Sequence, residues 1–198
     1  MIHKVLTEWE YLSIAGSFCQ KFRPVLFPER ITDGLKFVLV SREPLSSPYC
    51  YSQLLAFLKL NHVHEVVVLP HLSLQAGFQS YWQFQNKRVG KLLPTIIKFD
   101  MNTSHEEFEE GTKESFQYWQ MDYYIFDENL NFVIQYVQHR DFFILYFDDS
   151  VIIEGSTMLD DVLTDFDEMY ENSTDGFNQR EIEAIKSFWL PQQFIFTK

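Results

Sequence analysis

The sequence predicts an α+β fold, in which an antiparallel sheet meander in the C-terminal half is packed by helices and the N-terminal half mixes helices with strands. Short apolar runs separated by turn residues follow one another over 123–153, which is the pattern of antiparallel strands. Apolar residues at helical spacing recur near both ends of the chain. Of the 198 residues, 46% are apolar and 22% are charged, so one core is expected to form without a metal or disulfide framework.

In the N-terminal half, a capping box and helical periodicity predict a helix over 7–22. Ser47 and Pro48 have the character of an N-cap and an N1 proline, so a second helix is expected to begin there and to end near Asn61. Pro94 predicts an edge position for the strand that contains it. The strands expected in this half are 35–40, 63–69 and 92–99.

In the C-terminal half, Ser104 and Glu107 form a capping box at the start of an acidic helix that is expected to end near Trp119. The next strands are expected at 123–126, 132–137, 142–147 and 151–153. Two amphipathic helices are expected to cover one face of that sheet, and they span 158–171 and 178–190. The conformation of 70–92 is left open, because its pattern is ambiguous.

Charge is distributed unevenly along the chain. The net charge is −12, but residues 1–100 carry a net +4 and residues 101–198 a net −16. This balance opposes binding dominated by nucleic-acid phosphates or by an anionic membrane surface, so neither is expected as a partner. The segment 141–179 has 11 carboxylates, no Lys or Arg and many apolar residues, which indicates a folded acidic surface. We expect one compact domain over 1–198, and a subdivision into 1–100 and 101–198 stays open.

The chain is expected to be cytoplasmic. Its first residues include acidic side chains and lack the apolar run of about 7–15 residues that a secretory signal contains. The longest uncharged apolar runs are far shorter than the roughly 20 residues of a membrane-spanning helix. Cys19 and Cys50 lack the spacing of a disulfide framework or a zinc knuckle, and we expect them to be buried thiols.

Three histidines in one stretch are candidates for a metal site. On a strand, His62 and His64 would face the same side, as metal ligands can, and His71 follows. The nearby Glu65 would point to the opposite face, so no metal and no cofactor are expected. No nucleophile elbow, phosphate-binding Gly-rich loop or catalytic Cys signature occurs, and we do not expect an enzyme. A small metal-dependent hydrolase that uses His62, His64 and carboxylates stays open as an alternative.

The segment 122–134, DYYIFDENLNFVI, is followed by DFFI at 141–144 and by an acidic terminal helix. This pattern resembles the strand-turn-strand pattern of small cytoplasmic immunity proteins from bacterial polymorphic-toxin and contact-dependent-inhibition systems. The resemblance covers about a quarter of the chain. It implies a non-enzymatic protein that binds a cognate toxin domain, often a nuclease, and blocks its active site. Immunity families share no common functional residues, so no residue role is carried over.

Charge pattern alone selects the residues for such an interface. A concentrated anionic surface complements the cationic active site of a nuclease toxin, and rigid placement favours fast, electrostatically steered association. The same surface suits an acidic nucleic-acid mimic that inhibits a DNA-binding protein, and this alternative stays open. The selected carboxylates, which have no base near them in the sequence, and the two aromatic anchors are Asp148, Asp149, Asp160, Asp161, Asp165, Asp167, Glu168, Glu171, Tyr123 and Tyr170.

Overall fold

The structure is a computed structural model of the chain. It describes residues 2–4, 8–22, 34–70, 96–112, 122–137, 142–164 and 179–195. The central element is a seven-stranded sheet in the order β1-β4-β3-β5-β6-β7-β2, and every neighbouring pair is antiparallel. The α+β class is therefore confirmed. The strands are β1 (Ile2–Lys4), β2 (Lys36–Val40), β3 (Glu65–Pro70), β4 (Ile97–Asp100), β5 (Tyr123–Phe126), β6 (Phe132–Val137) and β7 (Phe142–Phe147).

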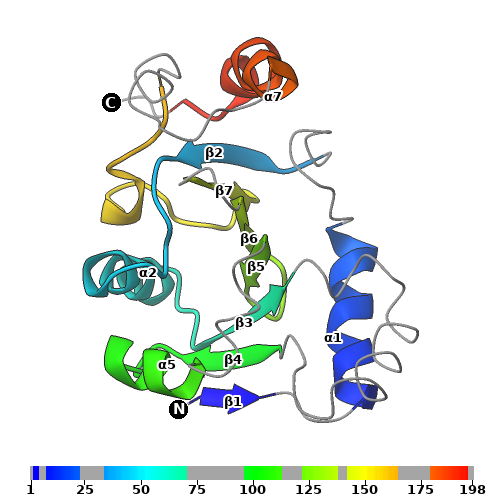
Figure 1. Cartoon of the computed structure of the whole chain (residues 1–198), viewed down its shortest axis with the longest axis vertical. Coiled ribbons are helices and arrows are strands. Elements are labelled where there is room, and N and C mark those ends of the chain that lie inside the picture. The colour runs from blue at the N-terminus through cyan, green and yellow to red at the C-terminus, as the bar shows by residue number, and fades with distance from the viewer. Residues whose placement is uncertain are drawn as a thin grey trace.

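Both faces of the sheet are buried. Every residue of β5, β6 and β7 is buried, although successive side chains of a strand point to opposite faces. Helices therefore have to cover both sides, and Figure 1 shows α1 on one side of the sheet with α2 and α5 on the other. The main helices are α1 (Glu8–Lys21), α2 (Pro48–Leu60), α5 (His105–Thr112) and α7 (Gln179–Ala184).

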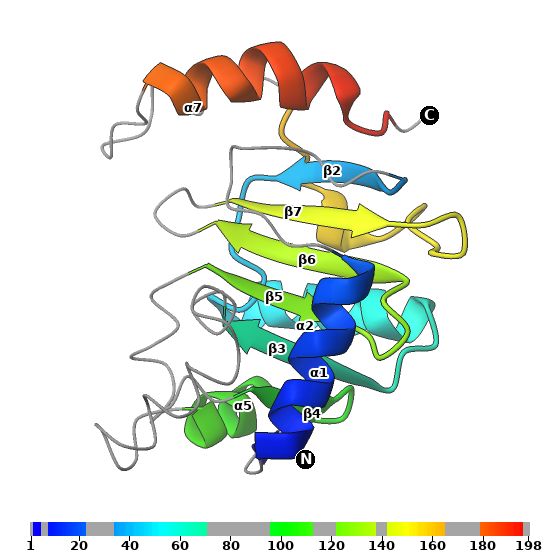
Figure 2. The same cartoon turned by 90° about the vertical axis from the view of Figure 1, so that its right-hand side faces the viewer.

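The core on the α1 side is built around aromatic rings. Phe18 of α1 lies with its ring centroid 4.6 Å from that of Phe126 and 5.0 Å from that of Tyr124, both on β5. After α7, the chain continues as a π-helical turn, Ile185–Trp189, and the Trp189 ring meets Phe37 of β2 at 5.2 Å. The expected last helix, 178–190, is thus helical over its described part and covers the β2 end of this face, as Figure 2 shows.

The core on the other side joins α2 and α5 to the sheet. Tyr51 of α2 packs against Phe99 of β4 and Phe108 of α5, with ring centroids 5.8 and 5.2 Å away. The capping box of α5 forms as expected, because the Ser104 amide donates to Glu107 Oε2 at 2.9 Å and the Glu107 amide to Ser104 Oγ at 3.1 Å. α5 therefore exposes its acidic side chains and is anchored to the core by its own buried residue Phe108.

Most sequence-predicted elements are confirmed, with boundaries shifted by one or two residues. The helix expected over 7–22 is α1, and Ser47 caps α2 by accepting a hydrogen bond from the Cys50 amide at 3.1 Å. The strand expected at 92–99 is described only as Ile97–Asp100, and its expected edge position is wrong. This strand, β4, pairs with β3 on one side and with β1 on the other, and a three-residue strand at the start of the chain has no pattern that sequence reasoning could detect.

Two predicted elements after β7 are wrong. Residues 151–153 form no strand, and the helix expected over 158–171 is limited to a 3₁₀ turn, η2 (Thr157–Leu159), in the described residues before 165. The outer edge of β2 explains why. Leu163 N donates to Leu39 O at 2.8 Å and Ser41 N donates to Asp161 O at 2.9 Å, so 161–163 is extended along an edge whose backbone groups need partners. Residues 165–171 lie outside the described residues.

The C-terminal segment completes the same edge. Phe194 N donates to Phe37 O at 2.8 Å, and the Gln193 side chain accepts from Leu39 N at 3.2 Å and donates to Leu163 O at 2.8 Å. Outward-facing backbone groups of Phe37, Leu39 and Ser41 therefore have partners within the chain, which disfavours pairing of this edge with another chain.

Removing the ring of Phe18 tests the core on the α1 side. Phe18 is fully buried and contacts Phe22, Tyr124 and Phe126, so Phe18→Ala is expected to lower the free energy of unfolding by about 3–5 kcal/mol. The exposed Gln20 on the same helix provides the control, and Gln20→Ala is expected to change it by less than about 0.5 kcal/mol. Equal effects in urea unfolding curves would contradict this packing.

Alkaline pH is expected to unfold the protein through its buried tyrosines. Burial raises the pKa of Tyr123, Tyr124 and Tyr146, so the folded chain keeps their protons where the unfolded chain releases them. The contribution of these tyrosines to the free energy of unfolding is fully present below about pH 10. Above that pH the free energy of unfolding falls by up to about 1.4 kcal/mol per pH unit for each tyrosine. Urea unfolding across this range measures the slope, and Tyr146→Phe should reduce it. An unchanged slope in this variant contradicts the assignment.

Candidate functional site

One end of the sheet gathers carboxylates from four separate segments. Glu65 begins β3, and Asp100 ends β4. Asp127 and Glu128 follow β5, and Asp148 and Asp149 follow β7. Because β3 is antiparallel to both β4 and β5, and β7 is antiparallel to β6, all these positions lie at the same end of the strands, where β7 points and β3 begins in Figure 2. We call this region the strand-end surface and define it by Glu65, Asp100, Asp127, Glu128, Asp148 and Asp149.

The β5–β6 turn is held by a buried carboxylate. Asp127 is 4% exposed, and its Oδ1 accepts a hydrogen bond from Asn131 N at 2.8 Å while its Oδ2 accepts one from Asn131 Nδ2 at 3.1 Å. Burial raises the pKa of Asp127, and the hydrogen bonds from backbone amides oppose that shift. The turn also holds Leu130 at φ 59°, in the left-handed region. Asp127 therefore shapes the turn and leaves Glu128 exposed beside it.

The end of α2 determines where the histidines lie. His62 has φ 55°, its amide donates to Lys59 O at 3.2 Å, and the Val63 amide donates to Leu58 O at 2.9 Å. This is a Schellman motif with His62 at the position where glycine is usual. Because the motif ends the helix, β3 begins only at Glu65, and the expected alternation of His62 and His64 on a strand is wrong.

Residues after β7 bind the end of α2. The Asn61 side chain donates to Ile152 O at 2.9 Å and accepts from Ile152 N at 2.6 Å. Ile152 remains 48% exposed and Leu60 36% exposed. These hydrogen bonds hold the exposed Ile152, three residues after Asp149 in the chain, against the end of α2.

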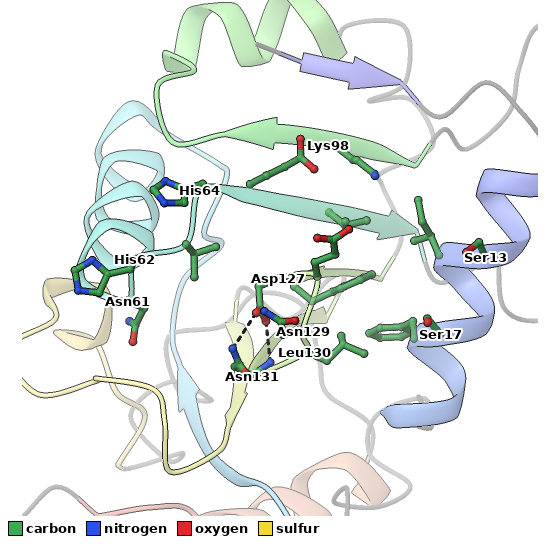
Figure 3. A pocket seen from close by; sticks show the side chains of 17 residues that line it. Ser13, Ser17, Asn61, His62, His64, Lys98, Asp127, Asn129, Leu130 and Asn131 are labelled. Carbon is green, nitrogen blue, oxygen red and sulfur yellow. Dashed lines mark hydrogen bonds between the residues drawn. The ribbon is translucent and has the colours of Figure 1, made fainter.

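A cavity of about 490 Å³ opens between α1 and the strand-end surface. Figure 3 shows Ser13 and Ser17 of α1 at one side, His62 and His64 at the other, and the turn at Asp127 between them. Its charged lining residues are Glu65, Lys98, Asp127 and Glu128. Lys98 Nζ lies 3.6 Å from Glu10 Oε1 on α1, so this ammonium is already paired.

The structure places the selected carboxylates that it describes at opposite ends of β2, with Asp148 and Asp149 at one end and Asp160 and Asp161 at the other. Asp149 forms an ion pair with Lys36, at the start of β2. Asp161 forms one with Arg42, beyond the other end of β2, with 3.1 Å between Oδ2 and Nη1. The five residue steps from 36 to 41 span about 17 Å in a strand, so Asp148 and Asp149 do not adjoin Asp160 and Asp161. The expectation that these carboxylates have no base near them is wrong for Asp149 and Asp161, because β2 brings basic residues from the N-terminal half.

The aromatic anchor Tyr123 is also in a different position from the one expected. Its side chain is 1% exposed, stacks near Tyr136 and donates to Glu43 Oε1 at 3.3 Å, so it belongs to the core and is not available at the surface. Sequence reasoning took it for an anchor because acidic residues surround it in the sequence. The remaining selected residues lie outside the described residues, and they are Asp165, Asp167, Glu168, Glu171 and Tyr170.

Sequence reasoning did not select Glu65 and Glu128. Both are exposed. Glu65 lies near the start of the strand expected at 63–69, and Glu128 lies two residues after the strand expected at 123–126. The available signal was that a charged residue directly before or after a strand lies at a sheet end. What was missing was the strand order. β3 and β5 are far apart in the sequence but neighbours in the sheet, and no local pattern encodes this pairing.

The described residues contain no group of three or more His, Cys, Asp or Glu side chains arranged to hold a metal ion. His71 lies outside these residues. Among the helices described, none has the length and apolar character needed to cross a membrane. No protein-family model, curated protein or solved structure matches the chain.

Replacing His62 tests its structural role against metal binding. Glycine adopts the left-handed conformation without the cost of about 1–2 kcal/mol that other residues bear, so His62→Gly is expected to leave the unfolding free energy unchanged or to raise it. Zinc chloride is expected to leave the melting temperature of the wild type unchanged. A zinc-dependent rise that His62→Gly abolishes would instead support the metal-dependent hydrolase.

Proposed function

We propose that this protein is a cytoplasmic immunity protein that binds a cognate bacterial toxin domain and covers its cationic active-site surface. The observation that carries the proposal is the strand-end surface, where carboxylates from four segments meet at one end of a rigid sheet. Fixed carboxylates at complementary positions speed up encounter with a basic surface and compete with an anionic substrate for it. The proposal makes the protein a binding partner with no catalytic residues of its own.

Exposed apolar residues at the end of α2 support the same interpretation. Leu60 and Ile152 are exposed, and Asn61, which follows Leu60 in the chain, is hydrogen-bonded to the backbone of Ile152. Protein interfaces combine an apolar centre, which contributes most of the affinity, with a charged surround that contributes rate and specificity. We infer that Leu60 and Ile152 contact the toxin directly, while Glu128 and Asp149 act on its approach.

The frame behind this surface reduces the cost of binding. The central strands β5, β6 and β7 are buried along their full length, and the turns after β5 and β7 are held by hydrogen bonds of Asp127 and Asp148. The backbone of such a frame loses little conformational freedom on binding, so more of the interaction energy appears as affinity.

The test uses the product of the adjacent reading frame, expressed as an inactive toxin domain. We expect a complex whose association rate falls as ionic strength rises, and protection of cells that express the active toxin. Glu128→Lys together with Asp149→Lys should slow association by about tenfold or more. Both side chains are exposed, and losing the surface ion pair of Asp149 with Lys36 should lower the free energy of unfolding by at most about 1 kcal/mol, so the variant should still fold.

A matched variant controls for total charge. Glu106→Lys with Glu110→Lys makes the same change in net charge on the exposed face of α5. It should slow association less than the strand-end variant does. Absence of a complex and of protection contradicts the proposed function, and equal rates for both variants contradict the assignment of the strand-end surface.

A further inference from the structure

The cavity beside the strand-end surface has an uneven distribution of charge. Among the residues that the structure describes, its lining contains the carboxylates of Glu65, Asp127 and Glu128 against one ammonium, that of Lys98. Glu10 pairs with that ammonium from α1, whereas Glu65 and Glu128 form no ion pair among the residues that the structure describes. The cavity therefore has a surplus of negative charge, and the two exposed carboxylates are available to a cation.

The rest of the lining adds apolar walls and neutral hydrogen-bonding groups. The partly exposed Ile14, Val63 and Leu130 supply the apolar walls, and Ser13, Ser17 and Asn129 supply polar groups at the rim. An apolar wall beneath a charged rim suits a side chain with a methylene stem and a cationic head. The volume of about 490 Å³ lies within the range of about 300–1,000 Å³ typical of sites that enclose a ligand.

We propose that this cavity is the binding site for an arginine side chain of the partner protein. Its stem packs on the partly exposed Ile14 and Leu130, and its guanidinium donates hydrogen bonds to Glu65 and Glu128. A guanidinium is planar, carries five donors and is weakly hydrated, so it pairs with carboxylates better than an ammonium does. The identity of the partner rests on the proposed function, but the preference for a guanidinium follows from the lining alone.

The same lining disfavours an anion. Within the described part of the chain, Lys98 is the only Lys or Arg of the lining, and it is paired with Glu10. Glu65 and Glu128 repel a phosphate or a carboxylate. His62 and His64 lie at the side of the cavity away from α1. Inorganic phosphate is therefore a useful negative probe.

The experiment is an NMR titration of the full chain with N-acetyl-arginine amide. Saturable shifts are expected at the backbone amides of Ser13, Ser17, Glu65 and Asn129. N-acetyl-citrulline amide has the same shape without the charge and should bind about tenfold more weakly, because charge-assisted hydrogen bonds are lost. The lysine analogue should also bind more weakly, and phosphate should cause no shifts at these positions.

Two variants make the titration specific. Glu65→Gln with Glu128→Gln removes both charges with almost no change in shape and should weaken arginine binding by about tenfold. Glu106→Gln with Glu110→Gln, on α5, should leave it unchanged. Equal binding of the citrulline analogue, shifts caused by phosphate in place of arginine, or equal loss in both variants would overturn the proposal.

The toxin complex separates this inference from the proposed function. Glu65→Gln with Glu128→Gln should raise the dissociation rate of the complex, whereas the α5 variant should not. If the complex forms and the pocket variant dissociates at the wild-type rate, the arginine site is wrong and the immunity function stands. If arginine amide binds as expected but the chain neither binds the toxin nor protects cells, the site stands and the immunity function is wrong.

Discussion

The fold depends on a sheet whose two faces must both be buried from solvent. β5, β6 and β7 carry apolar side chains at nearly every position, and only Gln135 interrupts them with a buried polar group. A sheet of this composition is stable only when helices cover it twice, so α1 and the α7 region take one face while α2 and α5 take the other. The surface left for binding is then limited mainly to the strand ends and the outer sides of the helices.

The edge of this sheet imposes a second requirement. The free backbone groups of β2 accept and donate hydrogen bonds to 161–163 and to Gln193 and Phe194, which extends those segments. These hydrogen bonds along the β2 edge hold Asp161 close to Arg42, just after the end of β2. The pair of Asp149 with Lys36 lies at the start of β2. The same requirement that disfavours edge-to-edge association thus divides the acidic C-terminal half into separate surfaces.

The strand-end surface and its cavity combine fixed geometry with a local excess of negative charge. Asp127 is used internally, since its carboxylate holds the β5–β6 turn, and this leaves Glu128 exposed at the rim. Across the cavity, Glu65 follows directly on the Schellman motif that ends α2. Two turn motifs, each stabilised by its own hydrogen bonds, therefore set the positions of the carboxylates that we assign to binding.

The sequence by itself determined the elements that depend on local chemistry. The Ser47 cap with Pro48, the Ser104–Glu107 capping box and the strands β5, β6 and β7 are stabilised by neighbours in sequence or by a simple apolar pattern. Tertiary structure alone decided which strands adjoin, which residues close the β2 edge and which acids meet bases. It buried Tyr123 and drew 161–163 out of the expected helix, because edge hydrogen bonds and burial across the sheet outweigh the local preference for an amphipathic helix. The juxtaposition of Glu65 with Glu128 likewise follows from the pairing of β3 with β5, which no local pattern encodes.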